Sequence, residues 1–256
     1  MAISLKSHPF LERVRFIPFA HRGGTSSAPE NTLRAFADAY EIGFRFMETD
    51  VHASTDGVLF AFHDDDLERT CGIPGSISSM SSDQVRRTLV NGTDPIPTLA
   101  ELFDSFPEAC FNIDCKSDTA LAPLIRDMRS TGLLDRVCIG SFSDRRLRAV
   151  REAFGAKVCT SAGPREVVAI TVGATRGVRQ DDGPHCLQIP RNQGPINLAT
   201  ERFVERAHRN GLRVHYWTID VPIAMNHLID VGADGIMTDQ PATLRDVLHA
   251  RSLWPH

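Results

Sequence analysis

Short apolar runs alternate with longer amphipathic stretches along most of this 256-residue chain. An apolar run of about four to eight residues bounded by turn residues is typical of a buried strand. A run at 58–62, after the turn Thr55-Asp56-Gly57, is expected to return as a hairpin arm. Eight further runs predict strands at residues 17–21, 46–51, 110–115, 137–141, 157–160, 186–189, 213–218 and 235–238.

The amphipathic stretches predict helices. Leu33, Phe36 and Tyr40 fall at i, i+3 and i+7 on one face, and Gly43 then ends the helix. Residues 98–101 have the pattern of a capping box, which marks the start of another helix. Further helices are expected at about residues 119–132, 143–155, 164–172, 200–211, 222–232 and 241–249.

Strand and helix therefore alternate eight times, which implies parallel strands joined by right-handed crossovers. Eight such units predict an α/β fold of the (β/α)8 TIM-barrel type. We expect one domain over residues 1–256, with 1–16 as a lead-in and 64–97 as a short insertion over the active-site face. Residues 83–89 are expected to form a short helix in that insertion. A doubly wound open sheet is the alternative, but it would not bring the polar residues at the strand ends together.

Composition narrows the class of protein. The net charge of -4 and the lack of a basic tract argue against a nucleic-acid partner. Residues 1–12 lack the apolar core of a signal peptide, and no apolar run reaches the length of a membrane span. We therefore expect a cytoplasmic protein without a transmembrane segment. The sequence does not indicate an oligomeric state.

The six cysteines form no Cys-x-x-Cys pair. Scattered buried thiols are the favoured interpretation, and zinc ligands are the alternative. The cysteines are Cys71, Cys110, Cys115, Cys138, Cys159 and Cys186.

Charged residues gather at the ends of the predicted strands. Glu48 and Asp50 point to the same face of one strand, because side chains alternate along a strand. Two buried carboxylates repel each other unless a cation lies between them, and oxygen ligands suit Mg2+ or Ca2+. Asp114 and Lys116 repeat the pattern on the next strand of the barrel. The chemistry that these residues suggest is metal-assisted attack on a phosphate ester.

Five ordered motifs carry a family resemblance. They are His21-Arg22-Gly23, Pro29-Glu30-Asn31-Thr32, Glu48-x-Asp50, His63-Asp64, and the Leu67, Arg69 and Thr70 that follow. Together they resemble the glycerophosphodiester phosphodiesterase family, whose fold is a TIM barrel. Two positions depart from the family pattern, since Asp114 stands where a glutamate is usual and Asp220 where an asparagine is usual.

The resemblance implies a role for each site residue. His21 is expected to be the general base and His63 the general acid. Glu48, Asp50 and Asp114 are expected to bind one divalent cation, Mg2+ or Ca2+. Arg22 and Lys116 are expected to contact the phosphate, with Glu30 holding Arg22, and Trp217 is expected to line the substrate pocket.

Each of these residues also has a simpler interpretation. Asp114 and Lys116 could form a structural ion pair, and Trp217 could be part of the core. The two histidines could be structural, as lone histidines usually are, and Arg22 could form a surface salt bridge. The clustering of these residues at strand ends favours the functional interpretation.

The expected reaction is hydrolysis of glycerophosphodiesters to sn-glycerol 3-phosphate and an alcohol. An alternative is a phospholipase D-like or lysophospholipid-specific phosphodiesterase on the same barrel, which would need an apolar rim for an acyl chain. A third hypothesis, from another class, is an inactive barrel that binds phosphodiesters. The headgroup preference and a cyclic phosphate intermediate stay open at this level.

Overall fold

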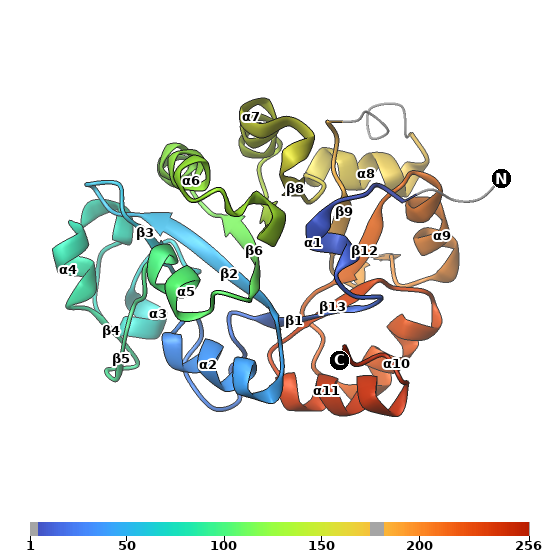
Figure 1. Ribbon diagram of the computed structural model, residues 1–256, viewed down its shortest axis with the longest axis horizontal. Coiled ribbons are helices and arrows are strands. Elements are labelled where there is room, and N and C mark those ends of the chain that lie inside the picture. The colour runs from blue at the N-terminus through green and yellow to red at the C-terminus, as the bar shows by residue number, and fades with distance from the viewer. Residues whose placement is uncertain (1–4, 175–181, 256) are drawn as a thin grey trace.

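Eight parallel strands form a nearly closed barrel in the computed structural model, which describes residues 5–174 and 182–255 (Figure 1). Each strand pairs with the next one along the barrel, and β1 pairs with β13. A single bridge between Ser161 and Cys186 joins the two ends of this sheet, β8 and β9. The strands are β1 (Ile17–His21), β2 (Phe46–Ala53), β6 (Cys110–Cys115), β7 (Val137–Gly140), β8 (Cys159–Thr160), β9 (Cys186–Ile189), β12 (Arg213–Tyr216) and β13 (Gly235–Thr238).

Helices surround the barrel and confirm the alternation that the sequence predicts. Thr32 accepts a hydrogen bond from the backbone N–H of Ala35 at the start of α2, and Gly43 ends that helix with a φ of 109°. Thr98 and Glu101 form the expected capping box at the start of α5. The helices are α2 (Leu33–Ile42), α5 (Leu99–Ser105), α6 (Asp118–Thr131), α7 (Asp144–Phe154), α8 (Pro164–Val172), α9 (Glu201–Arg209), α10 (Pro222–Asp230) and α11 (Pro241–Ala250).

Successive side chains of a strand point alternately toward the helices and toward the barrel axis, which separates core residues from site residues. On β2, Met47 and Val51 pack outward into the main apolar core under the helices. Glu48 and Asp50 lie on the opposite face, toward the barrel axis. The same period therefore builds the core and delivers the acidic residues to the interior of the barrel.

The lead-in contains a short helix that the sequence pattern does not reveal. Helix α1 (Pro9–Glu12) buries Phe10 and Leu11 completely. The ring of Phe10 packs against Phe19 and Phe46, with ring centroids 6.2 Å and 5.5 Å away. Because these two rings come from β1 and β2, α1 packs against the interior of the barrel. Four residues are too few to show a helical period, which explains why the helix was missed.

Residues 59–97 form an annex beside β2 with its own small core. Strand β3 (Leu59–Ala61) pairs antiparallel with β2, as the expected hairpin arm. Helix α4 (Ser82–Arg86) replaces the expected 83–89 helix and ends early, because the chain then enters β4 (Leu89–Val90). The other elements here are α3 (Glu68–Cys71), the 3-10 helix η1 (Ile77–Ser79) and β5 (Asp94–Pro95). The annex core comprises Phe60, Phe62, Leu67, Ile77, Val85, Val90 and Ile96.

Two predicted barrel strands are shorter by two residues in the structure. The run at 157–160 gives only β8, because the 3-10 helix η3 (Gly155–Lys157) occupies its start. The run at 213–218 gives β12, which ends at Tyr216. The remaining elements are the 3-10 helix η2 (Leu133–Arg136) and a hairpin of β10 (Asn192–Gln193) and β11 (Ile196–Asn197).

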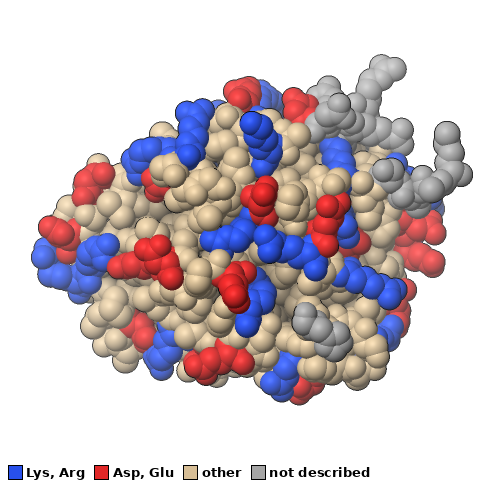
Figure 2. All heavy atoms as spheres, viewed as in Figure 1, with Lys and Arg blue, Asp and Glu red and all other residues tan. Residues whose placement is uncertain are grey.

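None of the helices in residues 5–174 and 182–255 is long and apolar enough to cross a membrane. Positive and negative side chains are interspersed on the face shown in Figure 2.

Candidate active site

One pocket, with a volume of about 400 Å3, collects every site residue that the sequence predicts. It lies at the carboxyl ends of the barrel strands, where the catalytic groups of this fold are found. No residue of the 64–97 insertion lines it among those that the structure describes. The predicted residues in its lining are His21, Arg22, Glu48, Asp50, His63, Asp114, Lys116 and Trp217.

The acidic residues of the pocket are buried and surround an ammonium group. Asp50 and Asp114 occupy paired positions of β2 and β6. The Nζ atom of Lys116 lies 2.8 Å from Oδ1 of Asp50 and 2.7 Å from Oδ2 of Asp114. The ion pair between Asp114 and Lys116, which was the simpler interpretation of these two residues, is therefore present and includes Asp50. The second oxygen of Asp114, Oδ1, is buried without a hydrogen-bond partner in the described part of the chain.

Burial and crowding shift the protonation of these carboxyl groups. Burial, followed by repulsion from Asp50, raises the pKa of Glu48 to about 7. Burial also raises the pKa of Asp114. For Asp50 burial acts in the same direction, but Lys116 and Arg22 outweigh it and lower the pKa. Burial thus disfavours the ionised forms of Glu48 and Asp114, and a cation beside these two carboxyl groups would offset this effect.

Each histidine is bonded to a carboxylate. The Nδ1 atom of His21 lies 2.7 Å from Oδ1 of Asp239, and its Nε2 lies 3.8 Å from Oε2 of Glu48. Burial alone would lower the pKa of His21, but Glu48 and Asp239 raise it above the ordinary value. The Nδ1 atom of His63 lies 2.6 Å from Oδ1 of Asp64. Asp239 and Asp64 thus contact Nδ1 of the two rings, which leaves Nε2 of each ring for acid–base catalysis.

Arg22 is held from two sides. Its NH1 atom lies 2.9 Å from Oε1 of Glu30, which confirms the expected contact, and its Nε lies 3.2 Å from Oδ2 of Asp50. Its backbone N–H donates to Oε2 of Glu48 at 3.1 Å. This donation requires a left-handed backbone, with a φ of 53° at Arg22. The guanidinium is thus fixed next to the acidic cluster.

Three site contacts were not predicted. Asp239, directly after β13, accepts the hydrogen bond from His21. Asp220 accepts hydrogen bonds from the Thr238 hydroxyl and the Asp239 N–H, and so positions Asp239. The Asn31 amide donates to Oδ2 of Asp50 at 3.1 Å. Only the position of Asp239 at the carboxyl end of a strand could have indicated its role.

Part of the pocket lining, which we call the apolar wall, consists of apolar side chains. Phe142 is 69% exposed at its edge and packs against Trp217 with ring centroids 5.8 Å apart. Trp217 thus lines the pocket, as expected, and also packs against the apolar core in the barrel interior. The other apolar residues of this wall are Ala162, Pro164, Val167, Ile189 and Pro190. The pocket therefore offers charged groups and, beside them, a surface suited to hydrocarbon.

The donor set fits a divalent cation. Glu48 and Asp114 each offer a buried carboxylate, and one Asp114 oxygen is unpartnered. The oxygens of these two residues and of Asp50 do not form one close group, because the Lys116 ammonium lies between Asp50 and Asp114. A bound cation would therefore compete with Lys116 for these two carboxylates.

The barrel and the acid–base groups at one end of it define a (β/α)8-barrel enzyme. A model of the glycerophosphoryl diester phosphodiesterase family matches residues 21–243. The chain accordingly belongs to the glycerophosphoryl diester phosphodiesterase family, and it is an enzyme of this class.

Similar proteins agree with this assignment. "Probable glycerophosphodiester phosphodiesterase 2" of Mycobacterium tuberculosis is 37% identical over 254 residues, which cover 96% of this chain and 95% of that protein. A human lysophospholipase D is 24% identical over 90% of this chain and 85% of its own length. The crystal structure of an Oleispira antarctica phosphodiesterase in complex with the product sn-glycerol-3-phosphate has a TM-score of 0.78 and 22% identity. The match covers 91% of this chain and 96% of that one, and it shows the shared fold.

Proposed function

We propose that this enzyme hydrolyses glycerophosphodiesters to sn-glycerol 3-phosphate and an alcohol, with His21 and His63 as the acid–base pair. The observation that carries the proposal is that two imidazoles, each bonded to a carboxylate, line the same pocket as a buried acidic cluster. The product named in the Oleispira antarctica complex supports the choice of substrate.

The two histidines divide the proton transfers. His21 is the general base, because Asp239 accepts its Nδ1–H and leaves Nε2 as the basic nitrogen. His63 is the general acid, which protonates the departing alkoxide. Asp64 is hydrogen-bonded to Nδ1 of His63 and so orients the ring. The nucleophile that His21 activates is a water molecule or the neighbouring hydroxyl of the glycerol.

Two positively charged side chains in the pocket bind the phosphate. Arg22 and Lys116 line the pocket and lie within ion-pair distance of Asp50. Their remaining N–H groups are free to donate to phosphate oxygens, and such charge-assisted hydrogen bonds are strong in a partly buried site. Both side chains thus orient the diester and offset its negative charge.

The acidic cluster is the proposed site of one divalent cation, Mg2+ or Ca2+, with Glu48, Asp50 and Asp114 as ligands. When bound, the cation supplies charge stabilisation at the phosphate and lowers the pKa of a coordinated hydroxyl or water. Glu48 is buried and raised in pKa without such a cation, which supports this assignment.

The test is kinetic, with glycerophosphocholine as substrate and Mg2+ or Ca2+ added. We expect His21→Ala and His63→Ala each to lower kcat by about 10²- to 10⁴-fold, the range of general acid–base catalysis. A rate within a factor of three of the wild type in either variant would remove that histidine from the mechanism.

A second candidate is hydrolysis of lysophospholipids, as in a lysophospholipase D. The apolar wall of the pocket and the exposed ring of Phe142 favour it, because an acyl chain needs such a surface. Comparing kcat/KM for lysophosphatidylcholine and glycerophosphocholine distinguishes the two candidates. Phe142→Asp is expected to lower only the lysophospholipid rate if the acyl chain follows this wall.

A further inference from the structure

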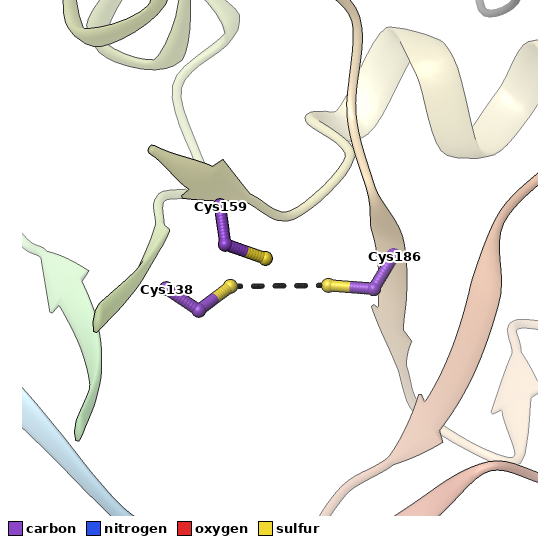
Figure 3. A group of neighbouring side chains, drawn as sticks. All are labelled: Cys138, Cys159 and Cys186. Atoms are coloured by element: carbon purple, nitrogen blue, oxygen red, sulfur yellow. Dashed lines mark hydrogen bonds between the residues drawn. The ribbon is translucent and has the colours of Figure 1, made fainter. Parts of the chain in front are cut away.

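Three cysteines that are far apart in the sequence meet inside the barrel. Cys138 lies on β7, Cys159 on β8 and Cys186 on β9, and all three side chains are fully buried (Figure 3). Their sulfur atoms lie within 4.8 Å of one another, and the Sγ atoms of Cys138 and Cys186 are 3.9 Å apart. The expectation of scattered thiols is therefore wrong for these three, because the curvature of the barrel brings neighbouring strands to a common centre. None of them is in a disulfide.

The group is separate from the candidate active site. Each of the three cysteines is the first or second residue of its strand, whereas the pocket lies at the strands' carboxyl ends. None of the three lines the pocket in the described structure. They belong instead to the apolar cluster that includes Phe10 of α1 and Phe19 of β1.

The thiols also lie on both sides of the junction at which a single bridge closes the barrel. Strands β8 and β9 are joined by one bridge, Ser161 to Cys186. Two backbone hydrogen bonds cross it, from Ala162 N–H to the Cys186 carbonyl and from His185 N–H to the Thr160 carbonyl. Cys159 stands on one side of this junction and Cys186 on the other.

Two neighbouring side chains have buried polar atoms without a hydrogen-bond partner in the described structure. His215 of β12 is fully buried, and neither of its ring nitrogens has a hydrogen-bond partner in the part of the chain that the structure describes. Its ring packs against Phe19 at 5.1 Å and interacts electrostatically with the Cys186 thiol. The Nε atom of Arg213, which pairs in register with Cys186, is likewise buried and unpartnered. A buried polar group without a partner is energetically costly. These atoms therefore indicate that this part of the apolar core binds a polar ligand.

The sulfur spacing suits a metal ion. Zinc–thiolate bonds of about 2.3 Å at a tetrahedral angle place two sulfurs about 3.8 Å apart. The observed separation of Cys138 and Cys186 is 3.9 Å, which is close to this value and much longer than a disulfide bond. Thiolate and imidazole ligands favour a soft ion such as Zn2+ over the Mg2+ or Ca2+ that carboxylates bind.

We propose that Cys138, Cys159 and Cys186 form a structural site for Zn2+ with three thiolate ligands, next to the buried imidazole of His215. Three thiolates and one Zn2+ carry a net charge of about -1, which the guanidinium of Arg213 offsets. The ion would connect β7, β8 and β9 across the junction that a single bridge closes, and so stabilise the barrel without taking part in the reaction.

The test is titration of the reduced, metal-free full-length protein with Co2+ and then Zn2+. We expect a thiolate-to-cobalt charge-transfer absorption that saturates at one ion per chain and is displaced by Zn2+. The carboxylates of the active site do not give this absorption, so Glu48→Gln is expected to leave it unchanged. Zn2+ is also expected to raise the melting temperature of the wild type.

Variants identify the ligands. Cys186→Ser is expected to abolish the absorption and the zinc-induced rise in melting temperature. Cys110→Ser is the matched control, since Cys110 is equally buried in the same apolar cluster but lies outside the group of three.

Three results would overturn the site. The first is a wild-type protein that gives no charge-transfer absorption and no thermal shift with Zn2+. The second is an absorption that Cys110→Ser removes as completely as Cys186→Ser does. The third is a Cys138–Cys186 disulfide in the protein as isolated, found by non-reducing mass spectrometry, which would make the pair a redox element.

Discussion

His21 and Asp239 are hydrogen-bonded at 2.7 Å although 218 positions separate them in the chain. The bond forms because β1 and β13 are neighbours in the barrel and each residue stands at or just after the carboxyl end of its strand. It fixes the tautomer of the imidazole, so that Nε2 is the nitrogen available to a substrate.

Asp239→Asn is expected to lower kcat by about 10- to 100-fold with little change in KM, because His21 loses the carboxylate that orients its ring. Asp220→Asn is the control, since an asparagine oxygen can still accept from the Thr238 hydroxyl and the Asp239 N–H. Steady-state kinetics of the two variants check the prediction. Equal rates in the wild type and Asp239→Asn would contradict it.

The assignment of His63 as the acid predicts a dependence on the leaving group. A p-nitrophenolate leaves without protonation, whereas the choline alkoxide needs a proton. His63→Ala is therefore expected to lose much less activity on the p-nitrophenyl ester of glycerol phosphate than on glycerophosphocholine. His21→Ala should lose similar factors on both substrates, and a reversed pattern would exchange the two roles.

Removal of divalent cations is expected to abolish turnover. Dialysis against a chelator should lower the rate by at least 10²-fold, and Mg2+ or Ca2+ should restore it. Glu48→Gln should not be rescued by either ion at ordinary concentrations. Glu108→Gln, a change at an exposed carboxylate far from the pocket lining, serves as the control. Full activity in a chelator would exclude the proposed cation.

The ionisation of the Asp64 carboxyl group makes the free energy of unfolding depend on pH in the acid range. Burial opposes ionisation here, but hydrogen bonds from Arg69 and His63 outweigh it and lower the pKa of Asp64 to about 2. The folded-state pKa lies below the unfolded value of about 3.9, so the stabilisation is present above pH ~4 and is lost as pH falls toward about 2. Because solvent screens the half-exposed Arg69, we expect ionised Asp64 to stabilise the folded state by about 1 kcal/mol at pH 6. Denaturant unfolding of Asp64→Asn should show this deficit at pH 6 and none near pH 2.

Gly23 is expected to tolerate no side chain. Its φ is 82°, and a Cβ there would lie 2.8 Å from backbone atoms of Ala35 and Phe36. Gly23→Ala should lower the free energy of unfolding by about 3 kcal/mol or more, from the backbone strain and the clash together. Gly72→Ala meets no atom within 4 Å at a φ of 68° and should cost about 1 kcal/mol. Equal losses in the two variants would contradict the steric argument.

The sequence reveals the strands and most helices because their signals are local. Alternating side chains on residues 46–51 and 110–115 separate core from site, and glycines such as Gly43 mark helix ends. The eight predicted site residues lie in one pocket for the same reason, since each stands near the carboxyl end of a strand.

The features that the sequence does not reveal are those set by closure of the barrel. Which strand lies beside β1 decides that Asp239 reaches His21. The curvature of β7 to β9 decides that three cysteines meet. The packing of α1 against Phe19 and Phe46 depends on the same closure. None of these contacts leaves a periodic pattern in the chain.

The pairing of β1 with β13 also has a consequence for biosynthesis. The register runs from Ile17 with Gly235 to Ala20 with Thr238. The first barrel strand, β1, can therefore complete its pairing only after the last one, β13, has left the ribosome. A nascent chain or a fragment truncated before residue 235 therefore has an unpaired edge on β1 and no carboxylate for its base. Catalytic competence should therefore appear only after residues 235–239 have left the ribosome and paired with β1.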